Sequence, residues 1–119
     1  MTNESLALTI DDADAALVVI HTDGYINNQG GEEIARVAYE LIDKGARTLL
    51  LDLAGTKIVN SIGISILIEI IEKMIEINGR LAFCSLTPTI EKTFHIMGLA
   101  QYASIYLDEA TARQALKAG

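Results

Sequence analysis

Hydrophobic and polar residues follow two periods along this chain, and the period of each segment predicts its secondary structure. An alternating run at residues 6–10 and a nearly all-apolar, β-branched run at 16–22 predict two strands. The short acidic turn between them favours an antiparallel hairpin. Three more strands are predicted, and the unalternating apolar run of the first of them indicates burial on both faces. These three strands cover residues 48–53, 80–85 and 103–107.

Between the strands, apolar residues recur every three or four positions, which is the period of an amphipathic helix. The predicted helices cover residues 32–44, 61–77, 88–97 and 108–117. Thr87 is the expected N-cap of the third, with Pro88 in its first turn. Strands that alternate with helices predict an α/β protein with a mixed, mostly parallel sheet, flanking helices and an N-terminal hairpin.

Two stretches rich in Gly, Asn or Lys are expected to be turns, at residues 23–31 and 54–57. The apolar stripe of the second helix is wider than burial on a sheet requires, which favours core packing with some exposed docking surface. The residues expected to form that stripe are Ile64, Leu67, Ile68, Ile71, Met74 and Ile75, and those expected to face inward from the third helix are Ile90, Phe94 and Met97.

Length and charge narrow the class of protein. A chain of 119 residues is expected to form a single domain over residues 1–119. A net charge of −7 without clustered Lys or Arg argues against a nucleic-acid partner, and favours a basic groove on another protein. The charged residues inside the second helix argue against membrane insertion, and the N-terminus lacks the pattern of a signal peptide, so a cytoplasmic location is expected.

Residues that could carry catalysis are few and scattered. The single cysteine, Cys84, lies in an apolar run and is interpreted as a core residue rather than a catalytic thiol. His21 and His95 belong to no short metal-binding motif, and Asp52 is interpreted as a strand residue that accepts backbone hydrogen bonds. No nucleophile, base and acid can be grouped, so no enzyme, catalytic residue, metal or cofactor is predicted.

The polar turn before the second helix is the most informative stretch. Asn60 or Ser61 can cap this helix by accepting a hydrogen bond from an N–H two or three residues later. Alternatively, Ser61 is a phosphorylation site, because the free N–H groups and the dipole of a helix N-terminus tolerate a phosphate without loss of the fold. The residues alone favour the cap and leave the switch open.

An ordered series of motifs resembles the STAS domain of anti-sigma factor antagonists. The series is Leu51-Asp52-Leu53, Asn60-Ser61-Ile62-Gly63, Asn78-Gly79, Leu86-Thr87-Pro88, Gly98-Leu99 and Asp108 to Ala112, and it extends over nearly the whole chain. Each motif is weak alone, and their order is specific.

This resemblance implies a partner-switching regulator that catalyses nothing itself. It implies that Ser61 is phosphorylated by an anti-sigma factor that is a serine kinase. The unphosphorylated form would bind this kinase and release a sigma factor, and a PP2C-type phosphatase would restore the serine. The residues that the resemblance places at the partner surface are Asn27, Asn60, Ser61, Ile62, Gly63 and Ile64.

The chain departs from the family pattern at three of these positions. Asn60 replaces the aspartate that precedes the serine, Ile62 replaces a second serine, and Asn27 stands where an aspartate is common. The loss of the aspartate removes a like charge beside a future phosphate, or removes a contact that the kinase reads. The alternative hypothesis is a non-phosphorylated STAS scaffold subunit of a transport or signalling complex.

Overall fold

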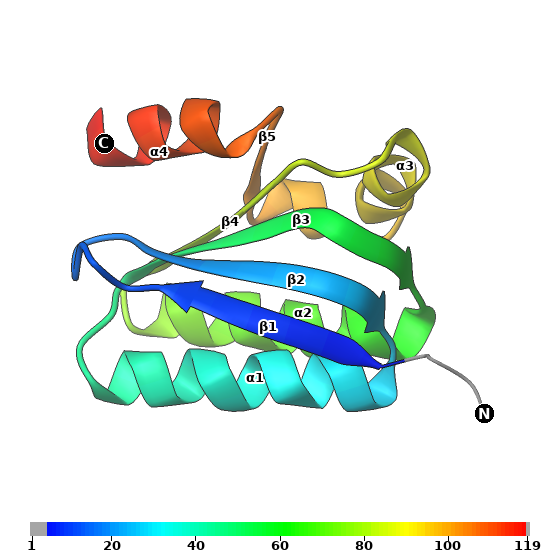
Figure 1. The fold of residues 1–119 in the computed structure, drawn as a ribbon, viewed down its shortest axis with the longest axis horizontal. Coiled ribbons are helices and arrows are strands. Elements are labelled where there is room, and N and C mark those ends of the chain that lie inside the picture. Colours follow the sequence, from blue (N-terminus) through cyan, green and yellow to red (C-terminus); the bar gives the residue numbers. More distant parts are fainter. Residues whose placement is uncertain (1–4, 119) are drawn as a thin grey trace.

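The protein forms one five-stranded sheet in the order β1-β2-β3-β4-β5, in a computed structural model that describes residues 5–118 (Figure 1). β1 pairs with β2 in an antiparallel hairpin, and the other three pairs are parallel. The mixed, mostly parallel sheet predicted from the sequence is therefore confirmed. The strands are β1 (Leu6–Asp11), β2 (Val18–Ile26), β3 (Thr48–Val59), β4 (Arg80–Cys84) and β5 (Ser104–Tyr106).

Helices cover both faces of this sheet. In Figure 1, α1 and α2 lie side by side below the sheet and α4 lies above it. The helices are α1 (Asn28–Asp43), α2 (Ser61–Glu76), α3 (Pro88–Ile96) and α4 (Glu109–Ala118), with a short 3-10 turn at Leu99–Gln101. Thr87 caps α3 through a bond from Ile90 N at 3.2 Å, as predicted.

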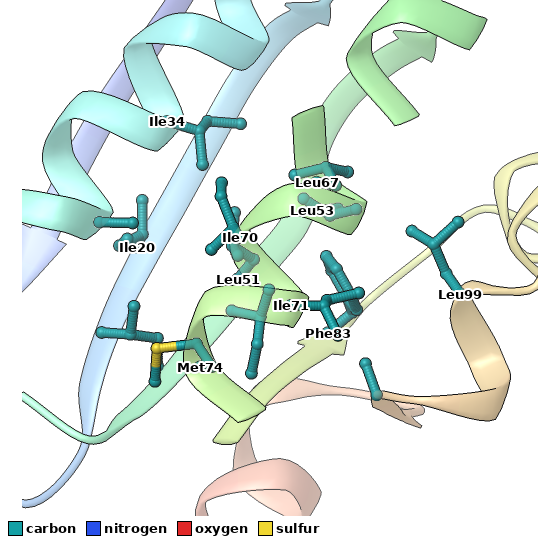
Figure 2. Close-up of a cluster of buried hydrophobic side chains, with 14 of the residues drawn as sticks. Ile20, Ile34, Leu51, Leu53, Leu67, Ile70, Ile71, Met74, Phe83 and Leu99 are labelled. Atoms are coloured by element: carbon teal, nitrogen blue, oxygen red, sulfur yellow. The ribbon is translucent and has the colours of Figure 1, made fainter. Parts of the chain in front are cut away.

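Two hydrophobic cores follow from the alternation of side chains along the central strands. Leu49, Leu51 and Leu53 of β3 face the large core between the sheet and helices α1 and α2, whereas Leu50 faces the small core between the sheet and α4. Burial on both faces explains why β3 is an apolar run without alternation. Figure 2 shows the large core, whose labelled members include Ile20, Ile34, Leu51, Leu53, Leu67, Ile70, Ile71, Met74, Phe83 and Leu99.

The two predicted turns at 23–31 and 54–57 are wrong, because β2 continues to Ile26 and α1 begins at Asn28, while β3 runs through 54–57 to Val59. The two strands stay paired to their ends at Ile26 and Val59, with two register shifts on the way. The buried hydroxyls of Thr22 and Thr56 are hydrogen-bonded to each other there. β-Bulges let Gly and Asp remain inside a pair of strands, so the turn signal was overridden by strand pairing.

Helix α1 begins four residues before the predicted start. Asn27 caps it by accepting a hydrogen bond from Gly30 N at 2.9 Å, and the first turn holds two buried glycines. Two inward assignments are also wrong. Ile75 of α2 is 52% exposed. Met97 is 46% exposed, because it is the residue that ends α3.

The first turn of α2 is fixed to the end of β2. Asn60 caps the helix, since its Oδ1 accepts a hydrogen bond from Gly63 N at 2.8 Å. The Asn60 N–H donates in turn to the Ile26 carbonyl at 3.1 Å. Gly63 lies against the same carbonyl, so close that a Cβ there would come within 2.2 Å of the oxygen.

We predict that Gly63→Ala destabilises the protein by about 1–3 kcal/mol, because the new methyl group would meet backbone that cannot move aside cheaply. Urea denaturation measures the change. Ser65→Ala, at an exposed position of the same helix, is the control and is expected to change stability by less than about 0.5 kcal/mol. Equal stability of the wild type and Gly63→Ala would contradict the close contact.

The cap of α2 gives a second prediction. Asn60→Ala is expected to cost about 1 kcal/mol of stability, whereas Asn60→Asp is expected to keep the cap, since both side chains offer an acceptor oxygen. Asn28→Ala, at the exposed first residue of α1, serves as the control. A cap role for Asn60 would be wrong if the alanine and aspartate variants had the same denaturation midpoint.

Candidate functional site

Ser61 is the first residue of α2 and is exposed to solvent. Asn60, not Ser61, is the side chain that caps the helix. The Ser61 hydroxyl makes no hydrogen bond to another residue within the described part of the chain, whereas its carbonyl accepts one from Ser65 Oγ at 3.0 Å. Of the two alternatives for the cap, the structure selects Asn60. The Ser61 hydroxyl is left accessible.

The surface beside Ser61 is apolar. Ile62, the next residue, is 52% exposed, and Ile58 near the end of β3 is 50% exposed. Ile58 and Ile62 thus expose apolar area shortly before and after Ser61 in the chain, and exposed apolar side chains are what the centre of a protein interface buries. This group, formed by Ile58, Asn60, Ser61 and Ile62, is called the Ser61 surface below.

The other residues expected at this surface have structural roles. Ile64 is 1% exposed and lies in the large core, so its side chain is not available to a partner. Gly63 is buried against Ile26. Asn27 is partly exposed and caps α1. Sequence position alone did not separate these supporting residues from the exposed ones.

A second polar group lies on the opposite face of the sheet, between the strands and α4. His21 Nε2 is 2.6 Å from Glu109 Oε1 and 3.6 Å from Asp52 Oδ2. Arg113 joins the group, donating from Nε to Glu109 Oε2 at 2.6 Å and from a terminal nitrogen to Asp11 at 2.9 Å. These ion pairs connect α4 to β1 and β2, and His21 also lies near Asp52 of β3.

No short sequence motif contains this group, because its members are far apart in the chain. His21, Asp52 and Glu109 come from β2, β3 and α4, and parallel pairing sets His21 opposite Asp52. Residue types that can bind a metal are common singly, so no sequence signal distinguished these three. The sequence prediction was that no short motif supplies metal ligands, and a group assembled by the fold lies outside that prediction.

The charge of Glu109 follows from its contacts. Partial burial raises the pKa of its carboxyl, but hydrogen bonds with His21 and Arg113 lower that pKa more strongly, to about 2. Glu109 is therefore ionised at neutral pH. Its negative charge lies in the first turn of α4, where the helix dipole also favours an anion.

The remaining candidates agree with their interpretation as structural residues. Cys84 is fully buried, and burial is the main cause that raises the pKa of its thiol to about 12, which leaves it unreactive at neutral pH. Asp52 Oδ1 accepts a hydrogen bond from Ala54 N at 2.9 Å, as predicted for a backbone acceptor. His95 is exposed and lies 3.6 Å from Glu91, one turn away on α3.

None of the helices in residues 5–118 combines the length and the apolar character needed to cross a bilayer.

Known proteins resemble this chain over nearly its whole length. A protein of Bordetella bronchiseptica, named as an anti-sigma factor antagonist and designated BtrV, is 25% identical over 112 residues, which cover 94% of this chain and 96% of that protein. The solved anti-sigma factor antagonist from Mycobacterium paratuberculosis superposes with a TM-score of 0.84 at 20% identity, covering 98% of this chain and 97% of the other.

The Bacillus cell fate determinant SpoIIAA has the same fold. Its phosphorylated form superposes with a TM-score of 0.74 at 20% identity, covering 92% of this chain and 99% of that chain. Its unphosphorylated form gives 0.81 at 18% identity, covering 95% and 98%. These names are those of regulators and not of enzymes, in agreement with the prediction of a non-catalytic protein.

The STAS domain model matches residues 7–112, from the hairpin at the sheet edge to the first turn of α4. The resemblance drawn from the ordered motifs is thus confirmed, and the chain belongs to the STAS domain family.

Proposed function

We propose that this protein is an anti-sigma factor antagonist whose binding to its partner is switched by phosphorylation of Ser61. The partner is an anti-sigma factor that is also a serine kinase. Binding of the unphosphorylated protein releases a sigma factor, and phosphorylation of Ser61 ends that binding. A PP2C-type phosphatase reverses the modification, and the cycle takes place in the cytoplasm.

The observation that carries this proposal is the division of roles between Asn60 and Ser61. Asn60 supplies the cap, so the Ser61 hydroxyl is exposed and is not required for the start of α2. In a serine that capped its own helix, the modified oxygen would be the cap itself, so phosphorylation would replace the bond that starts the helix. Here modification would leave the fold intact and would change only the surface, which is what a reversible binding switch requires.

A phosphate at this place would act through charge. It would add about −1.5 to −2 charge next to Ile62, the exposed apolar residue that follows Ser61 in the chain. Burying that charge in a packed interface costs free energy unless the partner supplies cations. The proposed switch therefore works by making the centre of the binding surface costly to desolvate.

The departures at Asn60 and Ile62 are compatible with such a switch. Asn60 keeps the capping bond that an aspartate would make, without a negative charge beside the phosphate. Ile62 adds exposed apolar area at the same surface, which favours partner binding before phosphorylation. The names of the relatives, as anti-sigma factor antagonists, support the same assignment.

The proposal predicts one phosphate on the protein after incubation with its cognate anti-sigma factor kinase and ATP, placed on Ser61 by mass spectrometry. Ser61→Ala is expected to accept none, and Ser65→Ala, one turn along α2, is expected to accept one as the wild type does. Ser61→Asp is expected to bind the kinase at least about tenfold more weakly, a loss of about 1.4 kcal/mol.

The opposite result would be an unmodified Ser61 together with unchanged binding by Ser61→Asp. That outcome would reject the switch and favour the alternative of a non-phosphorylated scaffold subunit in a transport or signalling complex. Asn60→Asp separately measures how a negative charge beside Ser61 affects its phosphorylation. This variant keeps the cap of α2, so a changed phosphorylation rate relative to the wild type reports the added charge alone.

The Ser61 surface gives a matched pair of substitutions. Ile62→Ala and Ile75→Ala remove the same side chain at opposite ends of α2, and both positions are 52% exposed. Ile62→Ala is expected to weaken kinase binding at least about fivefold, or about 1 kcal/mol, because it removes apolar contact at the interface. Ile75→Ala is expected to bind as the wild type does, measured by calorimetry. A reversed order would move the binding surface to the other end of the helix.

A further inference from the structure

The polar group between α4 and the sheet has the residue types of a metal site. Its members offer one imidazole and two carboxylates, His21, Asp52 and Glu109, and one ligand atom from each lies within 4.8 Å of the other two. Nitrogen from histidine together with carboxylate oxygen is a donor set that zinc and related divalent metals accept. We propose that these three residues bind a divalent transition metal of the zinc class.

Each carboxylate is oriented toward the imidazole by a partner outside the three residues. Asp52 Oδ1 accepts the Ala54 N–H, which leaves Oδ2 directed at His21 Nε2. Glu109 Oε2 accepts the Arg113 Nε–H, which leaves Oε1 directed at the same nitrogen. Metal ligands are commonly held in this way by hydrogen bonds from a surrounding shell.

Burial and charge favour a cation at this place. Asp52 is 7% exposed, and its Oδ2 lies 3.6 Å from His21 Nε2, which is beyond ordinary hydrogen-bond distance. Asp11 adds a third carboxylate, whereas Arg113 is the permanent cation in contact with the group. The three carboxylates outnumber the single guanidinium in this group, and a divalent ion would add positive charge beside the buried carboxylate of Asp52.

One of the ligand separations already suits a tetrahedral ion, and the other two would adjust as the ion binds. Ligand atoms of a tetrahedral zinc site are about 3.3 Å apart, as follows from bonds of about 2.0–2.1 Å. The separation of His21 from Asp52 already suits this value, and the 2.6 Å contact of His21 with Glu109 would widen as the metal replaces the shared proton. The side chains of His21 and Glu109 are 37% and 29% exposed, so solvent can supply a fourth ligand.

A metal here would join α4 to the sheet. The apolar contacts of this helix in the small core come from Ala112 and Leu116. An ion bound by His21 of β2, Asp52 of β3 and Glu109 of α4 would link three elements that are distant in sequence. The site lies on the face of the sheet opposite α2, so it is independent of the proposed phosphorylation of Ser61.

Zinc titration of the metal-free, untagged full chain tests this proposal. Native mass spectrometry is expected to show one bound Zn²⁺, and the melting temperature is expected to rise by at least about 5 °C when zinc is in large excess over its dissociation constant. Cobalt, used as a spectroscopic probe of the same site, is expected to give visible absorption bands of a low-coordinate complex.

Two histidine substitutions separate this site from weak binding elsewhere. His21→Gln keeps an amide donor for Glu109 and is expected to lower zinc affinity at least about tenfold. His95→Gln removes the exposed histidine beside Glu91 and is expected to leave affinity unchanged. Circular dichroism verifies that both variants are folded, and Asp52→Asn gives a second loss of binding. The proposal is overturned if the wild type binds no zinc, or if His21→Gln binds it as tightly as the wild type.

Discussion

The contact of Gly63 with the Ile26 carbonyl is the constraint on which the proposed switch depends. It sets the first turn of α2 directly against the end of β2, where any larger residue would meet backbone at 2.2 Å. The same carbonyl accepts the Asn60 N–H, so the cap and the close contact share one anchor. Because this turn is fixed on its inner side, Ser61 and Ile62 are directed outward.

This arrangement separates the stability of the helix from the chemistry of its surface. The core side of α2 is filled by isoleucine, leucine and methionine against β3 and β4, and its first turn is held by Asn60 (Figure 2). Ser61 contributes to neither. A residue with no structural task can gain and lose a phosphate without refolding, and this independence is the physical basis of the proposed function.

The opposite face of the sheet follows a different principle. There α4 buries few apolar side chains and is held instead by ion pairs of Glu109 and Arg113 with the strands. Polar contacts of this kind are directional, so they fix the position of the helix and bring an imidazole and two carboxylates together. The chain thus has two faces with separate roles, one built on apolar packing and one on charge.

The sequence by itself determined the order of strands and helices, the hairpin, the burial of β3 on both faces and the position of Ser61 at a helix start. These follow from local periodicity and from capping residues, which act over a few positions. It erred where pairing overrode local signals, as in the bulged extensions of β2 and β3 through Gly24 and Gly55.

The tertiary structure decided which of two adjacent residues caps α2, which isoleucines are exposed and which distant residues meet. Ile62 and Ile64 look alike in sequence, yet one is 52% exposed and the other 1%, because only the helix orientation on the sheet distinguishes them. His21, Asp52 and Glu109 meet through strand pairing and the placement of α4, since His21 is 31 positions from Asp52 and 88 from Glu109 in the chain, which leaves no local pattern to read.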